Sequence, residues 1–253
     1  MMKEKVLIHF TTNETSVYKL TNGNVLLQSR EQLFFNETLV HDEMLNKIYS
    51  FVEKIKSHVT NFGKESVRLY ATGIFQELSK EEKMQLLIQV FVKTDLYFNI
   101  IEPDLEQFYI ANSEDNNMIT GLVKQEFRKV VVCGSFQQNI KEISEIMNIM
   151  HEHNTEVLSP WTTNVVPETL GTDFILLEGQ ELLNDRDAWR HKYDHMNKFK
   201  KADAIIVCNP NGIIGKGTMF EFGFMIAHQK RIIFTEPPKD LSILFPYEIG
   251  LNL

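Results

Sequence analysis

Short apolar runs alternate with segments of helical spacing through the first half of the chain. Runs that are rich in β-branched and aromatic residues favour strands. The ranges expected as strands are Val6–Phe10, Ser16–Leu20, Val25–Ser29, Val67–Thr72 and Tyr97–Ile101. Asn22-Gly23-Asn24 predicts a hairpin turn, and apolar residues recur at helical spacing over Asp42–Asn61 and Lys80–Lys93. This order predicts a meander of three strands that parallel strands extend.

The second half repeats a stricter alternation of strand and helix after a polar, turn-rich stretch over residues 111–126. Strands are expected at Lys129–Cys133, Glu156–Ser159, Ala204–Cys208 and Arg231–Thr235, and helices at Gln138–His153, Glu181–Lys201 and Thr218–His228. Such alternation is typical of an open parallel sheet that binds ligands at the carboxyl ends of its strands. We therefore expect an α/β protein with domains over residues 1–112 and 128–253, joined by a linker over 113–127.

Composition narrows the classes of partner. The chain has 253 residues, of which 43% are hydrophobic, and its net charge of −8 disfavours broad binding to nucleic acid. No apolar run approaches the roughly 20 residues of a membrane span, and no signal peptide is recognisable, so we expect a cytoplasmic protein. The two cysteines, Cys133 and Cys208, both end apolar runs. They are expected as small buried hydrophobes and not as a disulfide or zinc site.

The segment Ala202–Met225 contains the most informative candidate chemistry. An apolar run is followed by a loop with three glycines and then by a predicted helix that contains Glu221 among phenylalanines. A strand that opens through a glycine-rich turn into a helix can bring backbone N–H groups close to a ligand. A carboxylate in apolar surroundings needs a partner or a task. Glu221 therefore either pairs within a structural helix or serves a ligand site.

The second half contains four motifs: V-V-V-C-G-S-F (130–136), E-V-L-S-P (156–160), H-x-x-K-F-x-x-A-D (195–203) and N-P-N-G-I-I-G-K-G-T-M-F-E-F-G-F (209–224). In this order and spacing they resemble the nucleoside 2-deoxyribosyltransferase-like family, which includes deoxynucleoside monophosphate N-glycosidases. The resemblance implies a Rossmann-like sheet, and Glu221 matches the nucleophilic glutamate of that family. Some transferases have an acidic residue where this chain has Gly215, so glycosidic cleavage is favoured over base exchange.

On this resemblance the expected enzyme cleaves or transfers the N-glycosidic bond of a (deoxy)nucleoside or nucleoside 5′-monophosphate. The alternative is a non-catalytic nucleotide-binding sensor. Glu221 and His195 are the expected catalytic residues, although His195 equally suits a helix surface. The expected substrate-binding residues are Gly134, Ser135, Phe136, Asn209, Gly212, Gly215, Gly217 and Thr218. For Gly134 and Ser135 a plain strand-to-loop turn is the other interpretation.

Further binding partners are expected to be few. His191 lies one helical turn before His195, but no acidic third ligand with suitable spacing is evident, so neither a metal nor a cofactor is expected. The expected partners are a small-molecule nucleoside or nucleotide and further copies of the chain, without nucleic acid or membrane.

The first half more faintly resembles the opening subdomain of the exopolyphosphatase/pppGpp-phosphatase family. The residues concerned are Val67–Thr72, Gly73-Ile74-Phe75-Gln76-Glu77 and Tyr97–Glu102. That family begins with a D-x-G-S-N-S phosphate loop, whereas this chain has H-F-T-T-N-E-T-S at 9–16, without the aspartate and the glycine. The resemblance implies a ribonuclease H-like half-domain that lacks the phosphatase chemistry.

Overall fold

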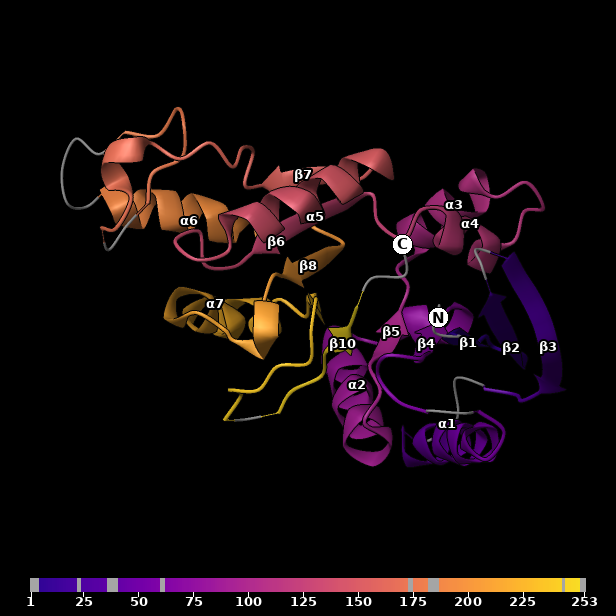
Figure 1. The fold of residues 1–253 in the computed structure, drawn as a ribbon. Helices are drawn as coiled ribbons and strands as arrows, with labels where there is room; N and C mark the ends of the chain where they lie inside the picture. Colours follow the sequence, from indigo (N-terminus) through magenta and orange to yellow (C-terminus); the bar gives the residue numbers. More distant parts are fainter. Residues whose placement is uncertain are drawn as a thin grey trace. The chain divides into compact units, whose positions relative to one another are not determined.

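The computed structural model describes residues 5–21, 24–35, 41–59, 62–172, 175–181, 187–242 and 244–250. The chain forms two compact units, Met1–Glu126 with Ile243–Glu248 and Phe127–Ser242 with Ile249–Leu251. Each unit is built on a five-stranded sheet with helices packed on it (Figure 1). The expected α/β class is thus confirmed, while the domain limits expected from the sequence stay a prediction.

The first unit has the strand order β3-β2-β1-β4-β5. The strands are β1 (Lys5–Phe10), β2 (Glu14–Thr21), β3 (Asn24–Gln32), β4 (Val67–Ala71) and β5 (Phe98–Ile100). β1, β2 and β3 form the expected antiparallel meander, and β4 and β5 extend it in parallel with β1. This is the ribonuclease H-like arrangement. The predicted turn residues Asn22 and Gly23 lie outside the described residues.

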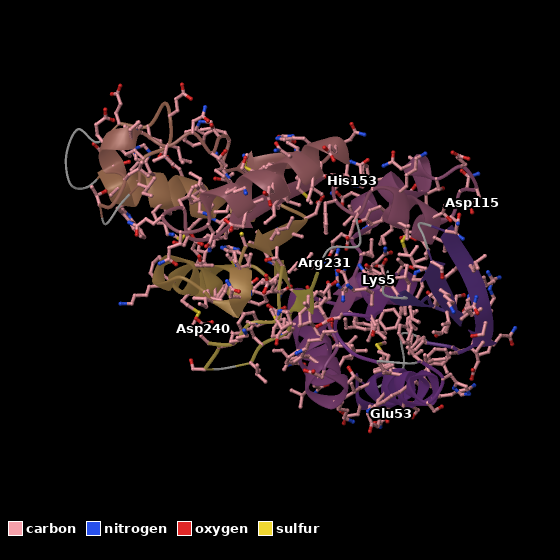
Figure 2. All side chains as sticks on the ribbon, in the orientation of Figure 1. Lys5, Glu53, Asp115, His153, Arg231 and Asp240 are labelled. Atoms are coloured by element: carbon pink, nitrogen blue, oxygen red, sulfur yellow. The ribbon has the colours of Figure 1, made fainter. Side chains whose placement is uncertain are left out.

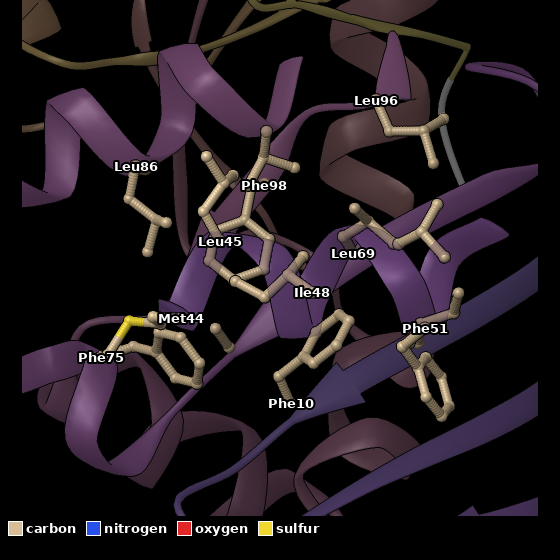
Figure 3. Close-up of a cluster of buried hydrophobic side chains, with 14 of the residues drawn as sticks. Phe10, Met44, Leu45, Ile48, Phe51, Leu69, Phe75, Leu86, Leu96 and Phe98 are labelled. Atoms are coloured by element: carbon tan, nitrogen blue, oxygen red, sulfur yellow. The ribbon is translucent and has the colours of Figure 1, made fainter. Parts of the chain in front are cut away.

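Helices cover both faces of this first sheet. They are α1 (His41–Lys56), α2 (Lys80–Thr94), α3 (Pro103–Asn112) and α4 (Met118–Lys124), with a short 3₁₀ helix over Gly73–Glu77. α1 and α2 cover one face, where the rings of Phe10, Phe51, Phe75 and Phe98 pack against one another in edge-to-face and tilted pairs (Figure 3). α3 and α4 cover the face that holds Leu7, Tyr18 and Tyr70. Burial of so much aromatic surface is the main source of stability for such a core.

Many charged side chains of the first unit lie on its surface, although Arg68 and Glu126 are buried. Figure 2 shows Glu53 on α1 and Asp115 before α4 pointing away from the sheet.

The predicted linker range contains α4, whose N-cap Asn117 accepts a hydrogen bond from the Ile119 N–H. α3 was likewise absent from the sequence-based elements. Among the described residues, no helix is both long and apolar enough to cross a membrane.

The second unit has the strand order β10-β9-β8-β6-β7. The strands are β6 (Lys129–Cys133), β7 (Glu156–Ser159), β8 (Ala204–Val207), β9 (Arg231–Phe234) and β10 (Glu248–Ile249). β7, β6, β8 and β9 are parallel neighbours. The expected open Rossmann-like sheet is confirmed. β7 is added on one side of β6, and β8 and β9 are added on the other side. The strand order therefore reverses between β6 and β8, where such sheets commonly bind ligands.

The α-helices in the described part of this unit are α5 (Ile140–Glu152), α6 (Asp187–Phe199) and α7 (Lys216–Ala227). α5 packs on the face formed by Val130, Val132, Ala204 and Ile206, and Cys208 faces the same cluster. α6 contacts β6, β7 and α7. Since side chains alternate along a strand, Cys133 points to the face opposite that of Val132 and reaches His195 on α6. The sheet therefore positions Cys133 next to the two helices that hold the candidate site.

Candidate functional site

A cavity of 980 Å³ lies at the carboxyl end of β6 in the second unit. Its walls include the turn after β6, the loop after β7, α6 and the first turns of α7. Among the sequence-predicted residues, the cavity is lined by Gly134, Ser135, Phe136, His195, Gly215, Gly217, Thr218 and Glu221. These eight residues come from three separate segments, and parallel strand order brings them to one place.

Asn209 and Gly212 are not among the residues that line the cavity. Asn209 is completely buried, and its side-chain amide donates to the Glu236 carbonyl while its oxygen accepts from the Glu236 N–H. Gly212 has a φ of +76°, and a Cβ there would lie 2.5 Å from the Pro237 carbonyl oxygen. Both residues therefore hold the loop after β8 against the segment after β9.

Gly134 lines the cavity for a reason of packing. A Cβ at this position would lie 3.0 Å from the Cys208 carbonyl oxygen and 3.1 Å from Ile143. The neighbouring Ser135 accepts hydrogen bonds at its carbonyl from the N–H groups of Gln138 and Asn139 and so leads the chain into α5. The backbone of Gly134 and Ser135 thus forms the expected turn between strand and loop. Both residues also line the cavity.

Glu221 is the centre of the site. It lies in the second turn of α7, is only 3% exposed, and contacts the Lys192 ammonium through Oε1. His195 Nε2 lies 3.3 Å from the same oxygen. Burial on its own would raise the pKa of Glu221, but the hydrogen bond and charge of His195, together with those of Lys192, lower it below its ordinary value. The carboxylate is therefore ionised at neutral pH.

His195 connects Glu221 to two further residues. Its Nδ1 lies 2.7 Å from Ser159 Oγ at the end of β7, and its Nε2 lies 3.6 Å from Cys133 Sγ. Its ring also packs edge to face on Phe199. The imidazole is thus fixed from both nitrogens and turned toward Glu221. Burial and then the nearby Glu221 charge raise the pKa of Cys133, so this cysteine is a neutral thiol in the present arrangement.

Sequence reasoning missed three members of this cluster. Lys192 lies three residues before His195, so both project from the same side of α6, but no motif singled it out. Ser159 was noted only as the end of a strand, and Cys133 only as a buried hydrophobe. The helical spacing of Lys192 and His195, with strand ends at Cys133 and Ser159, was a signal that could have found them.

The charges that line the cavity favour an anionic ligand. Lys192, Lys198 and Lys216 line it, against Asp194 and Glu221. α7 begins at the cavity wall with Gly215 as N-cap, and within the described part of the chain no side-chain hydrogen bond caps its start. Free N–H groups at a helix start, together with lysine side chains, are suited to bind phosphate.

No family model and no curated protein sequence matches the chain. Among solved structures it is similar to the Ppx/GppA family member of Aquifex aeolicus, with 13% identity and a TM-score of 0.33, over 83% of this chain and 67% of that one. It is also similar to an exopolyphosphatase from Cytophaga hutchinsonii, with 11% identity and a TM-score of 0.36, over 81% of this chain and 66% of that one. The chain thus spans about two thirds of their length. This is a remote likeness in fold, so the chemistry of the cavity rests on its own side chains.

These structures correct the function expected from the sequence. Cleavage or transfer of an N-glycosidic bond is wrong, and so is the alternative of a non-catalytic nucleotide sensor, because the matched proteins are exopolyphosphatases and Ppx/GppA phosphatases. They agree with the resemblance of the first half and do not support that of the second. The physical reason lies in the motifs: a strand, a glycine loop and a helix describe an edge of an open parallel sheet, and many reactions take place at such an edge.

Proposed function

We propose that the chain is a hydrolase that acts on a small phosphorylated molecule in the cavity of the second unit. The observation that carries the proposal is the buried Glu221 carboxylate, which is held between Lys192 and His195 on the wall of an open cavity. An ionised carboxylate next to cations and an open volume is suited to activate water beside a bound anion.

The phosphate group binds at the start of α7 in this proposal. Lys192 already lies close to that helix start, with its Nζ 3.5 Å from the Gly217 carbonyl oxygen. Gly217 is exposed, and a Cβ there would meet Lys192 Nζ at 3.8 Å. The absence of a side chain leaves room for a phosphate between the helix N–H groups and the lysine.

Glu221 acts as general base on a water molecule. The proton moves from water to Oε1, the water oxygen forms a bond to phosphorus, and the bond from phosphorus to the leaving oxygen breaks. A carboxylate with a lowered pKa is a weak base, so its basicity has to rise when substrate binds. A phosphate that draws Lys192 toward itself removes the lysine charge and hydrogen bond that help to lower the Glu221 pKa. Substrate binding thereby prepares the base.

His195 keeps its place during this exchange, because Ser159 holds its other nitrogen. It continues to donate to Glu221 and keeps the carboxylate oriented. The Trp161 indole, half exposed at the cavity rim with Lys198 Nζ 5.3 Å from its ring centroid, gives the cavity an aromatic wall for the rest of the substrate.

The experiment is a measurement of inorganic phosphate released from a panel of substrates by the full chain. The panel contains polyphosphate, nucleoside mono-, di- and triphosphates, sugar phosphates and p-nitrophenyl phosphate. Glu221→Gln is the matched variant, because it keeps the shape of the side chain and removes its charge. We expect release with at least one substrate and its loss in the variant. Equal phosphate release by wild type and Glu221→Gln on every substrate, or none at all, would overturn the proposal.

A further inference from the structure

Three side chains in the second unit present metal-binding atoms to one another. The ligand atoms of Cys133, His195 and Glu221 all lie within 4.8 Å of each other. Cys133 Sγ is 3.6 Å from His195 Nε2, which in turn is 3.3 Å from Glu221 Oε1. Zinc bonds of about 2.3 Å to sulfur and about 2.0–2.2 Å to nitrogen and oxygen, at tetrahedral angles, separate neighbouring ligand atoms by about 3.3–3.6 Å. Two of the three pairs already have this spacing, and the third pair, Cys133 and Glu221, lies within 4.8 Å.

The chemistry of the three donors selects a class of metal. A thiolate, an imidazole and a carboxylate together suit zinc and similar transition metals, whereas magnesium and calcium prefer oxygen donors alone. All three residues line the cavity, so the fourth position of a tetrahedral ion faces open space. Three protein ligands with an open fourth position are typical of a zinc ion that stays accessible to a ligand.

A second observation comes from the other side of the histidine ring. Ser159, which is buried, holds His195 Nδ1 at 2.7 Å. Histidines that bind metals nearly always have a hydrogen-bond partner at the second nitrogen, which fixes the ring orientation and the tautomer. Ser159 supplies that partner and turns Nε2 toward Cys133 and Glu221. From these observations we propose that Cys133, His195 and Glu221 form a binding site for Zn²⁺ or a similar transition-metal ion.

Lys192 pairs with the Glu221 carboxylate in the present arrangement, so a bound metal ion has to replace the lysine ammonium at Oε1. Its side chain is 28% exposed and can turn toward the open cavity, where its ammonium stays hydrated. The S–H bond of Cys133 breaks, a sulfur–metal bond forms and the proton passes to the buffer, with no change of oxidation state. The hydrogen of His195 moves from Nε2 to Nδ1, where Ser159 Oγ accepts it, so that the Nε2 lone pair binds the metal. The metal takes the Oε1 lone pair that the hydrolysis would use. The metal-loaded protein should therefore not hydrolyse phosphate compounds. This consequence rests on the proposed function, but the metal site itself does not.

The test is a titration of the full chain with Co²⁺ after treatment with a chelator and a thiol reductant. Cobalt replaces zinc in such sites and reports a thiolate ligand through a near-ultraviolet charge-transfer band. We expect this band, together with visible absorption of a tetrahedral ion, and its disappearance when Zn²⁺ is added. A titration without a charge-transfer band would overturn the proposal, whether or not the protein hydrolyses any phosphate compound.

Variants assign the band to its residues. Cys133→Ser should remove it, while Cys208→Ser should retain it, because Cys208 lies in the cluster on the α5 face of the sheet. Lys192→Ala removes the competing cation and should tighten Co²⁺ binding at least about fivefold. This last variant keeps all three ligands and tests the site even where Cys133→Ser does not fold. Loss of the band in Cys208→Ser, or weaker binding in Lys192→Ala, would contradict the assignment.

Discussion

Two carboxylates, Asp203 and Glu221, lie at opposite ends of the sheet in the second unit and have different surroundings. At the amino end, Asp203 accepts hydrogen bonds from the N–H groups of Arg128 and Lys129 at 2.9 and 3.0 Å and from the Arg128 guanidinium at 3.1 Å. At the carboxyl end, Glu221 faces an open cavity and is held by side chains alone. Backbone partners cannot leave without unfolding a strand, whereas a lysine can. The comparison separates a carboxylate that fixes the fold from one that is available to a ligand.

Glu221→Gln tests the available carboxylate and should have the largest effect. We expect phosphate release to fall about 10²- to 10⁴-fold, which is the usual contribution of a general base. The free energy of unfolding should change little, because the amide keeps the shape and can still pair with one neighbour. Turnover and urea unfolding are measured on the same preparation. If Glu221→Gln loses stability but keeps its turnover, Glu221 fixes the fold and is not the carboxylate that serves a ligand.

Asp203→Ala tests the structural carboxylate. It leaves two strand-start N–H groups and the Arg128 guanidinium without their shared acceptor, which should lower the free energy of unfolding by about 3 kcal/mol. Turnover per folded molecule should stay at the wild-type level, because Asp203 lies before β8, at the end away from the cavity. Equilibrium urea unfolding measures the first quantity. Reduced turnover at full folding would show that the two ends are coupled.

The sequence predicted the strands of the second unit better than the residues of the candidate site. β6 and β7 begin and end at the predicted residues, because β-branched runs bounded by polar turns leave little choice of register. α4 was taken for a linker, since its helical repeat is short and follows Asn116-Asn117. Glu221 and His195 were predicted as site residues, but Lys192 and Ser159 were not. A motif reports neighbours along one segment, whereas a site is assembled from segments that only the strand order brings together.

A second comparison concerns two histidines, one on helix α6 and one near the end of strand β1. His195 in the second unit faces the cavity, while His9 at the end of β1 in the first unit is bonded through Nε2 to Thr72 Oγ1 at 2.9 Å. Burial lowers the pKa of His9 to about 4, because desolvation disfavours the charged imidazolium. Thr12 accepts from the Ile74 N–H and closes the same edge of that sheet. His9 therefore serves the fold as a neutral ring.

This difference predicts a pH dependence of stability. The unfolded chain binds a proton at His9 near pH 6.5, while the folded chain does so only near pH 4. The contribution of His9 is thus present above pH 6.5 and is lost as the pH falls toward 4. Between pH 7.5 and 5 the loss should be about 2 kcal/mol. Urea unfolding of wild type and His9→Gln at both pH values checks it, because the variant lacks this component and should show a smaller decrease. Equal decreases in the two proteins would place His9 in contact with solvent.

Ser159→Ala sharpens the role of His195 and should have the smallest effect. The loss of one hydrogen bond costs about 1 kcal/mol, which corresponds to a roughly fivefold fall in turnover if the bond only orients the ring. The readout that separates orientation from packing is the tautomer of His195, observed by nitrogen-15 NMR of the imidazole. With Ser159 donating to Nδ1, the hydrogen is on Nε2 and points at Glu221. Without it, the two tautomers should both be populated. An unchanged tautomer in the variant would mean that Glu221 alone orients the ring, and the cluster would then depend on α6 and α7 without support from β7.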